Sequence, residues 1–353
     1  MPEISKQVKL DYFLLVGIGL LFLLSVIVLR SIAPSLFPLY YVYLIFSILA
    51  FFIFLRIDFE VVSLFSKHLY VGSIIFLFLP LLIGQVTRGT VRWIPLGPLS
   101  IQPAEIARPF LLVFFANYLT EKTLDRKRIF KALLLLALPV FLILVQPSFG
   151  VAFLTALGFI GVLIASGLDK RYLLTGISLT LMLVPLIWLL LAPYQRQRIT
   201  SFFDPNQDPF GAGYNSIQSM VSVGSGMLLG RGLGKGVQTQ LAFLPERHTD
   251  FIFASISEEM GFIGSIIIIL GLFLVFWRLI KIIESARSFS ARAFVSGFFI
   301  VLFVESMVHI GMNLGLLPIT GVPLPLVSAG GSSLLATMIG FGLALGSQKP
   351  STA

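Results

Sequence analysis

Long uninterrupted apolar runs are the feature that most constrains how this chain folds. A membrane-spanning helix needs about 20 apolar residues, and these runs are continuous rather than alternating, which favours helices over a β-barrel. Only 12% of the 353 residues are charged, whereas a soluble domain has about a quarter. The sequence therefore predicts an all-α polytopic membrane protein with about ten transmembrane helices, at residues 12–31, 39–56, 69–86, 104–120, 131–146, 148–167, 172–192, 251–282, 292–313 and 326–346.

Lysine and arginine are divided unevenly between the two sides that these spans define. The side with both termini carries about twice as many cations as the other, which predicts that it is cytoplasmic. The net charge of +9 is then explained by topology and does not call for a nucleic acid partner. The first run, 12–29, is too long for the apolar part of a signal peptide, so it is expected to remain as a span. The densest cytoplasmic run holds Lys122, Arg126, Lys127, Arg128 and Lys131.

The opposite side has two long polar segments, at residues 85–102 and 193–250. The second is far longer than an ordinary connection, and it alternates apolar pieces with glycine and polar residues. We expect a single transmembrane domain over 1–353 with 193–250 as an extracytoplasmic loop between helices 7 and 8, folded into short surface helices. Cations on this side favour an anionic ligand, with contacts to lipid headgroups as the alternative. They are Arg88, Arg92, Arg196, Arg198, Arg231, Lys235 and Arg247.

A crowded charged stretch, Glu246 to Asp250, stands where the long polar segment meets the eighth apolar run. Asp250 could simply cap the helix that follows, since aspartate does this well. It could also be a base at the boundary between water and lipid. Burial against Phe251 would raise its basicity, whereas Arg247 and His248 would lower it. The two interpretations are compatible, and the second suits proton abstraction.

Several ionisable residues fall inside the predicted spans, where charge is expensive and usually functional. Glu105 and Arg108 are three residues apart and can pair on one helix face. Glu305 and His309 are four apart, and for them a structural role is favoured. Glu258 and the adjacent Glu259 point to different faces, so at most one should face a cavity. For each pair the alternatives are a cavity contact or a charge pair that fixes helix packing.

Two unusual segments complete the inventory. Residues 230–236 hold four glycines with Arg231 and Lys235, but they lack the Ser or Thr of a phosphate-binding P-loop, so a flexible cationic loop is expected whose amides could still meet a phosphate. Residues 316–333 are apolar yet rich in proline and glycine, which predicts a non-helical, cavity-lining segment. The chain has no cysteine and its three histidines are scattered, so no metal site is predicted.

Four stretches together resemble the SEDS family of bacterial cell-wall polymerases, and its elongation branch more than its division branch. Ala104 and Ala329 depart from the family's usual residues, and Arg108 replaces a usual lysine. None of these changes touches Asp250, which stands at the family's catalytic aspartate. The four stretches are Arg92-Trp-Ile-Pro-Leu-Gly with Gln102-Pro-Ala-Glu105, Asp204-Pro to Gly236, Leu244 to Gly261, and Asn313-Leu-Gly-Leu-Leu-Pro through Ser333.

The resemblance implies a peptidoglycan glycosyltransferase of the bacterial cytoplasmic (inner) membrane, with its active site on the extracytoplasmic face. It would polymerise lipid II into glycan strands during elongation and cell-shape maintenance, and release undecaprenyl pyrophosphate. Its implied partners are a class B penicillin-binding protein and the elongation machinery. No cofactor is required by the sequence, although a divalent cation (Mg or Mn) could share the neutralisation of pyrophosphate. The rivals are a lipid II flippase and a non-catalytic scaffold for the penicillin-binding protein.

In this interpretation Asp250 is the catalytic residue. The cations on the outer side would bind substrate, with further contacts expected from Trp93, Glu246, His248, Ser328 and Ser332. The embedded residues Glu105, Arg108, Glu258, Glu305 and His309 would line the cavity or form structural ion pairs.

Overall fold

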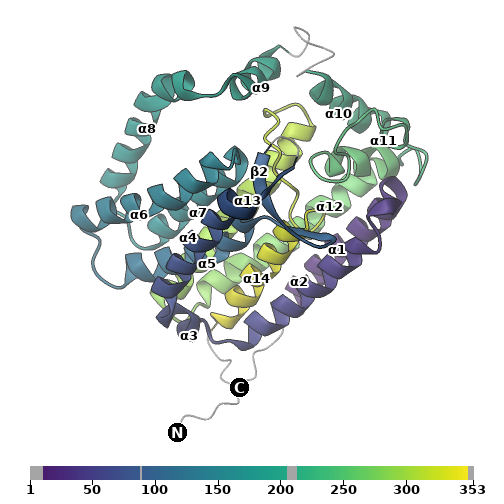
Figure 1. Ribbon diagram of the computed structural model, residues 1–353. Helices are drawn as coiled ribbons and strands as arrows, with labels where there is room; N and C mark the ends of the chain where they lie inside the picture. The colour runs from purple at the N-terminus through teal and green to yellow at the C-terminus, as the bar shows by residue number, and fades with distance from the viewer. Residues whose placement is uncertain (1–10, 88–89, 205–212, 349–353) are drawn as a thin grey trace.

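The computed structural model describes residues 11–87, 90–204 and 213–348 of the chain. Helices dominate this part of the chain, and each of the ten predicted spans has a long helix near its expected position (Figure 1). These helices are α1 (Tyr12–Ile32), α2 (Leu39–Arg56), α4 (Ser66–Ile83), α5 (Pro103–Thr120), α6 (Arg126–Val145), α7 (Phe149–Ala165), α8 (Lys170–Leu190), α12 (Ile252–Glu284), α13 (Phe289–Asn313) and α14 (Gly331–Gly346).

Local sequence explains where several helices begin. The Asp11 carboxylate accepts the Leu14 amide at 3.1 Å, and the Asp125 carboxylate accepts the Arg128 amide at 2.8 Å. Such N-caps satisfy amides that have no partner within the helix. Pro103 occupies the first turn of α5, where its missing amide costs nothing.

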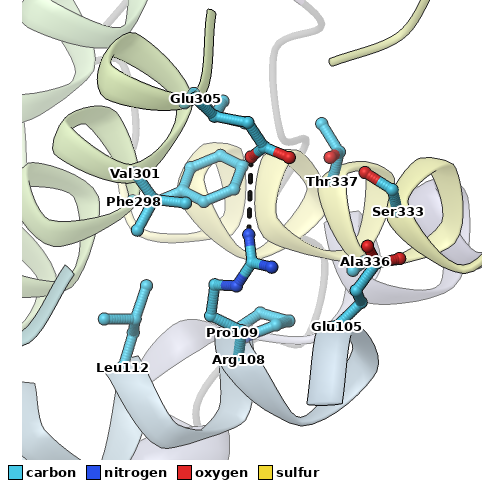
Figure 2. A pocket seen from close by; sticks show the side chains of 11 residues that line it. Glu105, Arg108, Pro109, Leu112, Phe298, Val301, Glu305, Ser333, Ala336 and Thr337 are labelled. Carbon is cyan, nitrogen blue, oxygen red and sulfur yellow. Dashed lines mark hydrogen bonds and ion pairs between the residues drawn. The ribbon is translucent and has the colours of Figure 1, made fainter. Parts of the chain in front are cut away.

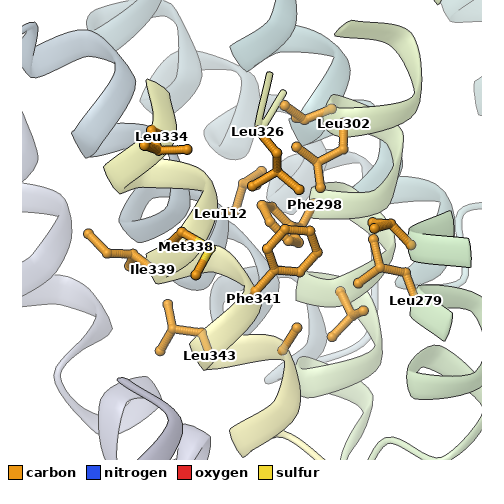
Figure 3. Close-up of a cluster of buried hydrophobic side chains, with 14 of the residues drawn as sticks. Leu112, Leu279, Phe298, Leu302, Leu326, Leu334, Met338, Ile339, Phe341 and Leu343 are labelled. Carbon is orange, nitrogen blue, oxygen red and sulfur yellow. The ribbon is translucent and has the colours of Figure 1, made fainter. Parts of the chain in front are cut away.

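The bundle is built around α5, which is buried on nearly all sides and contacts α4, α13, α14 and α7. Other pairs pack along their lengths: α14 with α2, α13 with α7, and α1 with α12. Figure 3 shows the centre of the core, where Leu112 of α5, Phe298 of α13 and Phe341 of α14 meet. The carboxyl end of α14 is held by Arg287, whose amide donates to the Ser347 carbonyl and whose guanidinium lies 2.7 Å from Asp58.

Six helices of the described chain are long and apolar enough to cross a membrane: α1, α2, α4, α6, α12 and α13. Two further apolar helices, α7 and α14, are shorter, while α5 carries Glu105 and Arg108 within the bundle. Large apolar side chains remain exposed along the outer helices, among them Leu23, Phe52 and Leu134. Since soluble proteins rarely expose such continuous apolar surface, this belt indicates contact with lipid.

The eighth predicted span, 251–282, is not one continuous helix. α12 is 33 residues long but breaks at Gly261, which has φ of 66° and ψ of −156°. Every residue of 252–259 is buried, whereas 262–284 alternates buried with exposed apolar residues. At 1.5 Å per residue the second part is about 34 Å long, enough to cross the hydrocarbon core by itself. The part of α12 next to Asp250 is therefore a buried half-helix, which we call the α12 half-helix (residues 252–260).

The all-α prediction holds for most of the chain, but it did not include the short β-strands found in the polar segment 85–102. This segment forms a three-stranded antiparallel sheet of β1 (Gln85–Thr87), β2 (Thr90–Leu96) and β3 (Leu99–Ile101). Leu96 pairs with Leu99 across a two-residue turn in which Gly97 has φ of 65°, a conformation that tight hairpin turns need. The Tyr43 hydroxyl binds both the carbonyl and the amide of Ser100, at 2.9 and 2.8 Å. The sheet is thereby fastened to α2.

The long segment between α8 and α12 forms short helices, as the sequence predicts. These are α9 (Pro193–Phe203), α10 (Tyr214–Ser225) and α11 (Val237–Gln240), and residues 205–212 lie outside the described part. The segment 314–330 between α13 and α14 is non-helical, as its prolines predict, and Leu324, Leu326 and Val327 within it are buried. Two shorter elements, η1 (Pro34–Leu36) and α3 (Phe59–Leu64), complete the fold.

Candidate active site

Asp250 lies at the end of a tight turn that leads into α12. Glu246 adopts φ of 51°, which is uncommon outside glycine and often marks functional sites. Its carbonyl accepts the amides of Thr249 at 3.0 Å and Phe251 at 3.2 Å. The N-cap residue of α12 is Phe251, one position after Asp250, and no side-chain bond caps the helix from that position.

The backbone around Asp250 is held from α13 and from the non-helical segment 314–330. The Asn313 amide group donates to the Asp250 carbonyl at 3.0 Å. The Ser328 hydroxyl donates to the Thr249 carbonyl at 2.8 Å, and the Ala329 amide donates to the His248 carbonyl at 2.9 Å. Three consecutive carbonyls therefore have fixed partners, which holds the backbone of Asp250 in place.

The non-helical segment also passes beside the Asp250 carboxylate. A Cβ atom placed on Gly321 would lie 3.4 Å from Asp250 Oδ2, and Gly321 has φ of 69°. Two residues earlier, the Ile319 carbonyl accepts a hydrogen bond from the Arg198 guanidinium of α9 at 3.2 Å. A small pocket adjoins this contact and is lined by Arg198, Ser201, Phe202, Ser216, Pro318 and Ile319. The Arg198 guanidinium and the pocket that it lines therefore lie close to the segment that borders Asp250.

The other predicted cations divide into three groups. Arg247 and Arg196 each bind a backbone carbonyl, of Ile32 at 3.2 Å and of Leu189 at 2.6 Å. The charge of Arg92 acts on the carboxylate of Glu105 in the interior of the bundle. Arg231 and Lys235 are exposed, and Arg88 lies outside the described residues. Glu246 and His248 lie in the turn itself, with 3.9 Å between Glu246 Oε2 and His248 Nε2.

The embedded charges form pairs that differ from those expected. Arg108 binds Glu305 of α13 at 3.4 Å across the bundle, in place of the pair expected with its neighbour Glu105 (Figure 2). Arg108, Glu305 and Glu105 all line one small pocket, which Ser333 and Ala336 of α14 also border. The His309 imidazole binds the Val322 carbonyl at 2.8 Å and so supports the non-helical segment. Sequence spacing finds neighbours on one helix, but it does not show which helix packs opposite.

Glu258 and Glu259 are both buried, and both bind the outer loop rather than a cavity. Glu258 accepts the amides of Gln238 and Thr239, at 2.8 and 3.0 Å. Glu259 accepts the Gly234 amide at 3.1 Å. The glycine-rich loop 230–236 was expected to be flexible with free amides, yet the amides of residues 230, 231, 232, 234 and 235 all donate within the protein. Those amides are therefore not available to a phosphate.

The remaining candidates have structural contacts. Ser328 accepts the Leu324 amide at 2.8 Å in addition to its bond to Thr249, and Ser332 accepts the Gln102 amide at 2.8 Å. Both serines are buried. Trp93 lies in β2, in register with Gln85 of β1.

Sequence reasoning missed two residues that shape the site. Asn313 is fully buried at the end of α13 and binds Asp250, Ala254 and His309, the last two at 3.1 and 2.8 Å. Gly321 gives the non-helical segment its close approach to Asp250. A lone asparagine at the end of an apolar span was the available signal for Asn313. Gly321 had no comparable signal, because its role depends on a neighbour 71 residues away in sequence.

No group of three or more metal-binding side chains lies together in the described part of the chain.

Comparison with known proteins identifies a family over nearly the whole chain. The family described as cell cycle protein, that of FtsW, RodA and SpoVE, matches residues 6–351. The peptidoglycan glycosyltransferase MrdB of Escherichia coli K12 is 40% identical over 283 residues, which are 79% of this chain and 76% of MrdB. The probable peptidoglycan glycosyltransferase FtsW of Buchnera aphidicola subsp. Baizongia pistaciae is 35% identical over 306 residues, 84% of this chain and 80% of that protein.

Solved structures with the same fold give a consistent result. A structure of a peptidoglycan synthase complex, described as coordinating polymerization and crosslinking, matches with a TM-score of 0.82 and 32% identity, over 95% of this chain and 96% of that one. The rod shape determining protein RodA of Thermus thermophilus matches with a TM-score of 0.73 and 29% identity, over 97% of each chain.

Proposed function

The chain belongs to the FtsW/RodA/SpoVE family of cell cycle proteins, and from this membership we infer that it polymerises the glycan strands of the cell wall. The family expected from the sequence motifs is thus confirmed. The protein is a peptidoglycan glycosyltransferase, like MrdB and the FtsW proteins that it resembles over most of its length. Elongation and cell-shape maintenance are its proposed setting, since the similarity extends to MrdB and to RodA, a rod shape determining protein.

We propose lipid II as substrate and Asp250 as general base. The 4-hydroxyl of the acceptor sugar attacks the anomeric carbon of the donor, its proton passes to the Asp250 carboxylate, and the bond to undecaprenyl pyrophosphate breaks. Pyrophosphate is a good leaving group, so a second carboxylate as general acid is less necessary than in glycoside hydrolysis. The observation that carries this assignment is the fixed backbone of Asp250 beside Gly321 and the Arg198 cavity.

Cations of the outer segments would neutralise the pyrophosphate, which gains charge as it departs. Arg198 is the best placed of them, because its contact with Ile319 brings it next to the segment that borders Asp250. Exposed Arg231 and Lys235 are available to a second phosphate group. If a divalent cation such as Mg or Mn were bound with the substrate, it would supply further positive charge to the pyrophosphate.

We also propose how the protein is placed in its membrane. Ten helices would cross the cytoplasmic membrane of a bacterium as one domain, with both termini inside. The segment 193–250 between the seventh and eighth crossings, and Asp250 with it, would then face outward, where lipid II and polymer are handled. A class B penicillin-binding protein is the proposed partner within the elongation machinery, supported by the similarity to a peptidoglycan synthase complex.

The first prediction tests the base. Asp250→Asn should fold and insert normally, because the anchoring bond from Asn313 goes to the backbone carbonyl and not to the carboxylate. Loss of a general base lowers the rate by about 100-fold or more. The measurement is polymerisation of purified lipid II by the purified chain, with and without a class B penicillin-binding protein. Polymer formation at the wild-type rate would show that Asp250 is not the base.

The same purified protein, placed in liposomes, distinguishes polymerisation from the two rival functions. A flippase moves lipid II across a liposome bilayer without polymer growth, and a scaffold does neither. Polymer formed by wild-type protein, and lost in Asp250→Asn, is explained by neither rival.

A further inference from the structure

The loop 226–240 is joined to α12 at the point where that helix breaks. In a continuous helix the amides of Phe262 and Ile263 would bind the carbonyls of Glu258 and Glu259. Here those two amides donate to the carbonyls of Met227 and Leu228, at 2.8 and 3.3 Å. The freed carbonyls of Glu258 and Glu259 accept instead the amides of Arg231 and Gly232, at 2.8 and 2.9 Å. The loop therefore replaces two lost helical bonds with four of its own.

Glycines allow this close contact. A Cβ atom on Gly230 would lie 2.6 Å from the Met260 amide nitrogen, and one on Gly261 would lie 2.6 Å from the Leu228 carbonyl oxygen. Both glycines also have positive φ, 81° and 66°. No larger residue fits at either position without displacing the loop.

Two buried carboxylates extend the attachment beyond the break. Both oxygens of Glu258 accept backbone amides of α11, from Gln238 and Thr239. Glu259 Oε1 accepts the Gly234 amide at 3.1 Å and the Gln240 side-chain amide at 2.8 Å. Hydrogen bonds to charged groups are stronger than those between neutral groups, so these contacts are among the strongest that hold the loop. Each glutamate is only 1% exposed.

The attachment turns the two cations of the loop outward. The amides of Arg231 and Lys235 are bound within the protein, whereas their side chains are exposed. The same α12 half-helix begins two residues after Asp250. Glu258 lies eight residues beyond Asp250, which is about 12 Å along a helix. One rigid piece of helix thus links the proposed base to the loop that carries the cations.

We propose that Glu258 and Glu259 are positioning residues, which hold Arg231 and Lys235 at a fixed place relative to Asp250 so that these cations bind the pyrophosphate of the polyprenyl substrate. The proposal rests on the glycosyltransferase function and extends it. The two glutamates act through the loop and do not touch substrate.

The second prediction concerns isosteric variants of these glutamates. Glu258→Gln replaces an acceptor oxygen with an amide donor that faces another donor, the Thr239 or Gln238 amide, so the loop should detach. Trypsin should then cleave the full-length protein after Arg231 and Lys235 faster than in the wild type. The kcat/KM for lipid II should fall by about tenfold or more, mainly through a higher KM, because the lost contacts bind phosphate charge. Glu259→Gln should give smaller effects of the same kind, because both amide partners of Glu259 bind Oε1 and the amide oxygen of glutamine can take that place.

A double-variant comparison distinguishes positioning from general support of the fold. Arg231→Ala with Lys235→Ala should reproduce the rise in KM, and adding Glu258→Gln should cause little further loss, because coupled residues are not additive. Glu284→Gln is the matched control. It removes an acid from the far end of α12 whose partner is Lys281 at 2.9 Å, and it should alter neither cleavage nor KM.

Three results would overturn the proposal: unchanged trypsin cleavage in both glutamine variants, losses that add fully in the combined variant, or an unchanged KM in Glu258→Gln. The base assignment is tested separately by Asp250→Asn. If Asp250→Asn is active, the base assignment fails. Trypsin cleavage of the two glutamine variants still shows whether Glu258 and Glu259 hold the loop. If Asp250→Asn is inactive and Glu258→Gln leaves KM unchanged, the positioning proposal fails alone.

Discussion

At the scale of single residues, the site depends on polar side chains that hold the backbone. Asn313 binds the Asp250 carbonyl and the His309 carbonyl through its amide nitrogen, and it accepts the Ala254 amide through its oxygen. Its own carbonyl accepts the Ser219 hydroxyl of α10 at 2.9 Å. One fully buried residue therefore joins α13, α12 and α10 next to the proposed base.

The third prediction is that Asn313→Ala lowers both stability and activity. It leaves buried carbonyl and amide groups without partners, each at a cost of about 1–3 kcal/mol. A shift of Asp250 by about 1 Å would lower kcat on the order of 100-fold. The measurements are the melting temperature in detergent and lipid II polymerisation.

Asn117→Ala provides the control for that variant. Its amide donates to the Ser66 hydroxyl at 2.9 Å, in the part of the bundle remote from Asp250. It should lower stability and leave the kcat of the folded protein unchanged. If Asn313→Ala also retains full kcat, then Asn313 does not position the base.

At the scale of elements, the break in α12 separates two functions that the sequence joins in one apolar run. The α12 half-helix is buried and carries two glutamates, whereas residues 262–284 face both core and lipid. Ser257 and Ser265 bind each other across the break at 2.8 Å. The break at Gly261 is thus a defined feature of the fold. The loop 226–240 supplies the hydrogen-bond partners that the interrupted helix lacks on both sides of it.

The fourth prediction is that Gly261→Ala displaces the loop 226–240 from α12. The new Cβ would collide with backbone atoms of Leu228 and Gly230, which cannot rotate away as a side chain can. The backbone conformation of Gly261, with φ of 66° and ψ of −156°, is one that essentially only glycine adopts, and it costs any other residue about 1–3 kcal/mol. Faster trypsin cleavage after Arg231 and Lys235 is the direct measurement.

Gly72→Ala is the matched control for that substitution. Gly72 lies in α4 with no atom within 4 Å of an added Cβ, so alanine should be neutral or slightly stabilising. Equal cleavage rates in the two variants would show that Gly261 is not needed for the contact between loop and helix.

At the scale of the whole molecule, one ion pair connects the helices of the bundle interior. Arg108 of α5 and Glu305 of α13 are 3.4 Å apart, with side chains only 9% and 1% exposed. The pocket they share also borders α14 (Figure 2). Whether this pair serves packing or the reaction is the alternative that the sequence left open.

The fifth prediction resolves that alternative. Arg108→Met alone should destabilise by about 3–5 kcal/mol, because Glu305 is left as an unpaired buried charge. Adding Glu305→Gln should recover most of the folded yield. Recovery of polymerisation as well would assign the pair to packing, whereas a folded but inactive double variant would assign it to the reaction.

Lys281→Met is the control for that experiment. Its partner Glu284 is 2.9 Å away, but the two side chains are 48% and 59% exposed. Exposed pairs contribute about 0–1 kcal/mol, so little should change. If Lys281→Met lowered the free energy of unfolding as much as Arg108→Met does, then burial of the ion pair would not be what makes its loss destabilising.

Much of this protein could be predicted from sequence because its strongest signals are local. Apolar run length places the long helices, since a helix satisfies its backbone bonds within one segment. Prolines in 316–333 exclude a helix there. The charged turn before α12 identifies Asp250 as a candidate base, because its residue types and its place at a boundary are both visible in the sequence.

Tertiary structure alone decided the partners. Arg108 binds Glu305 rather than Glu105, Glu258 binds the amides of α11, and Gly321 borders Asp250. Each contact joins residues far apart in sequence, so no spacing rule predicts it. The break in α12 also depends on tertiary contacts, because a continuous apolar run that contains a single glycine is predicted from sequence as one helix. Only the loop, by exchanging hydrogen bonds with residues 258–263, makes two pieces the more stable arrangement.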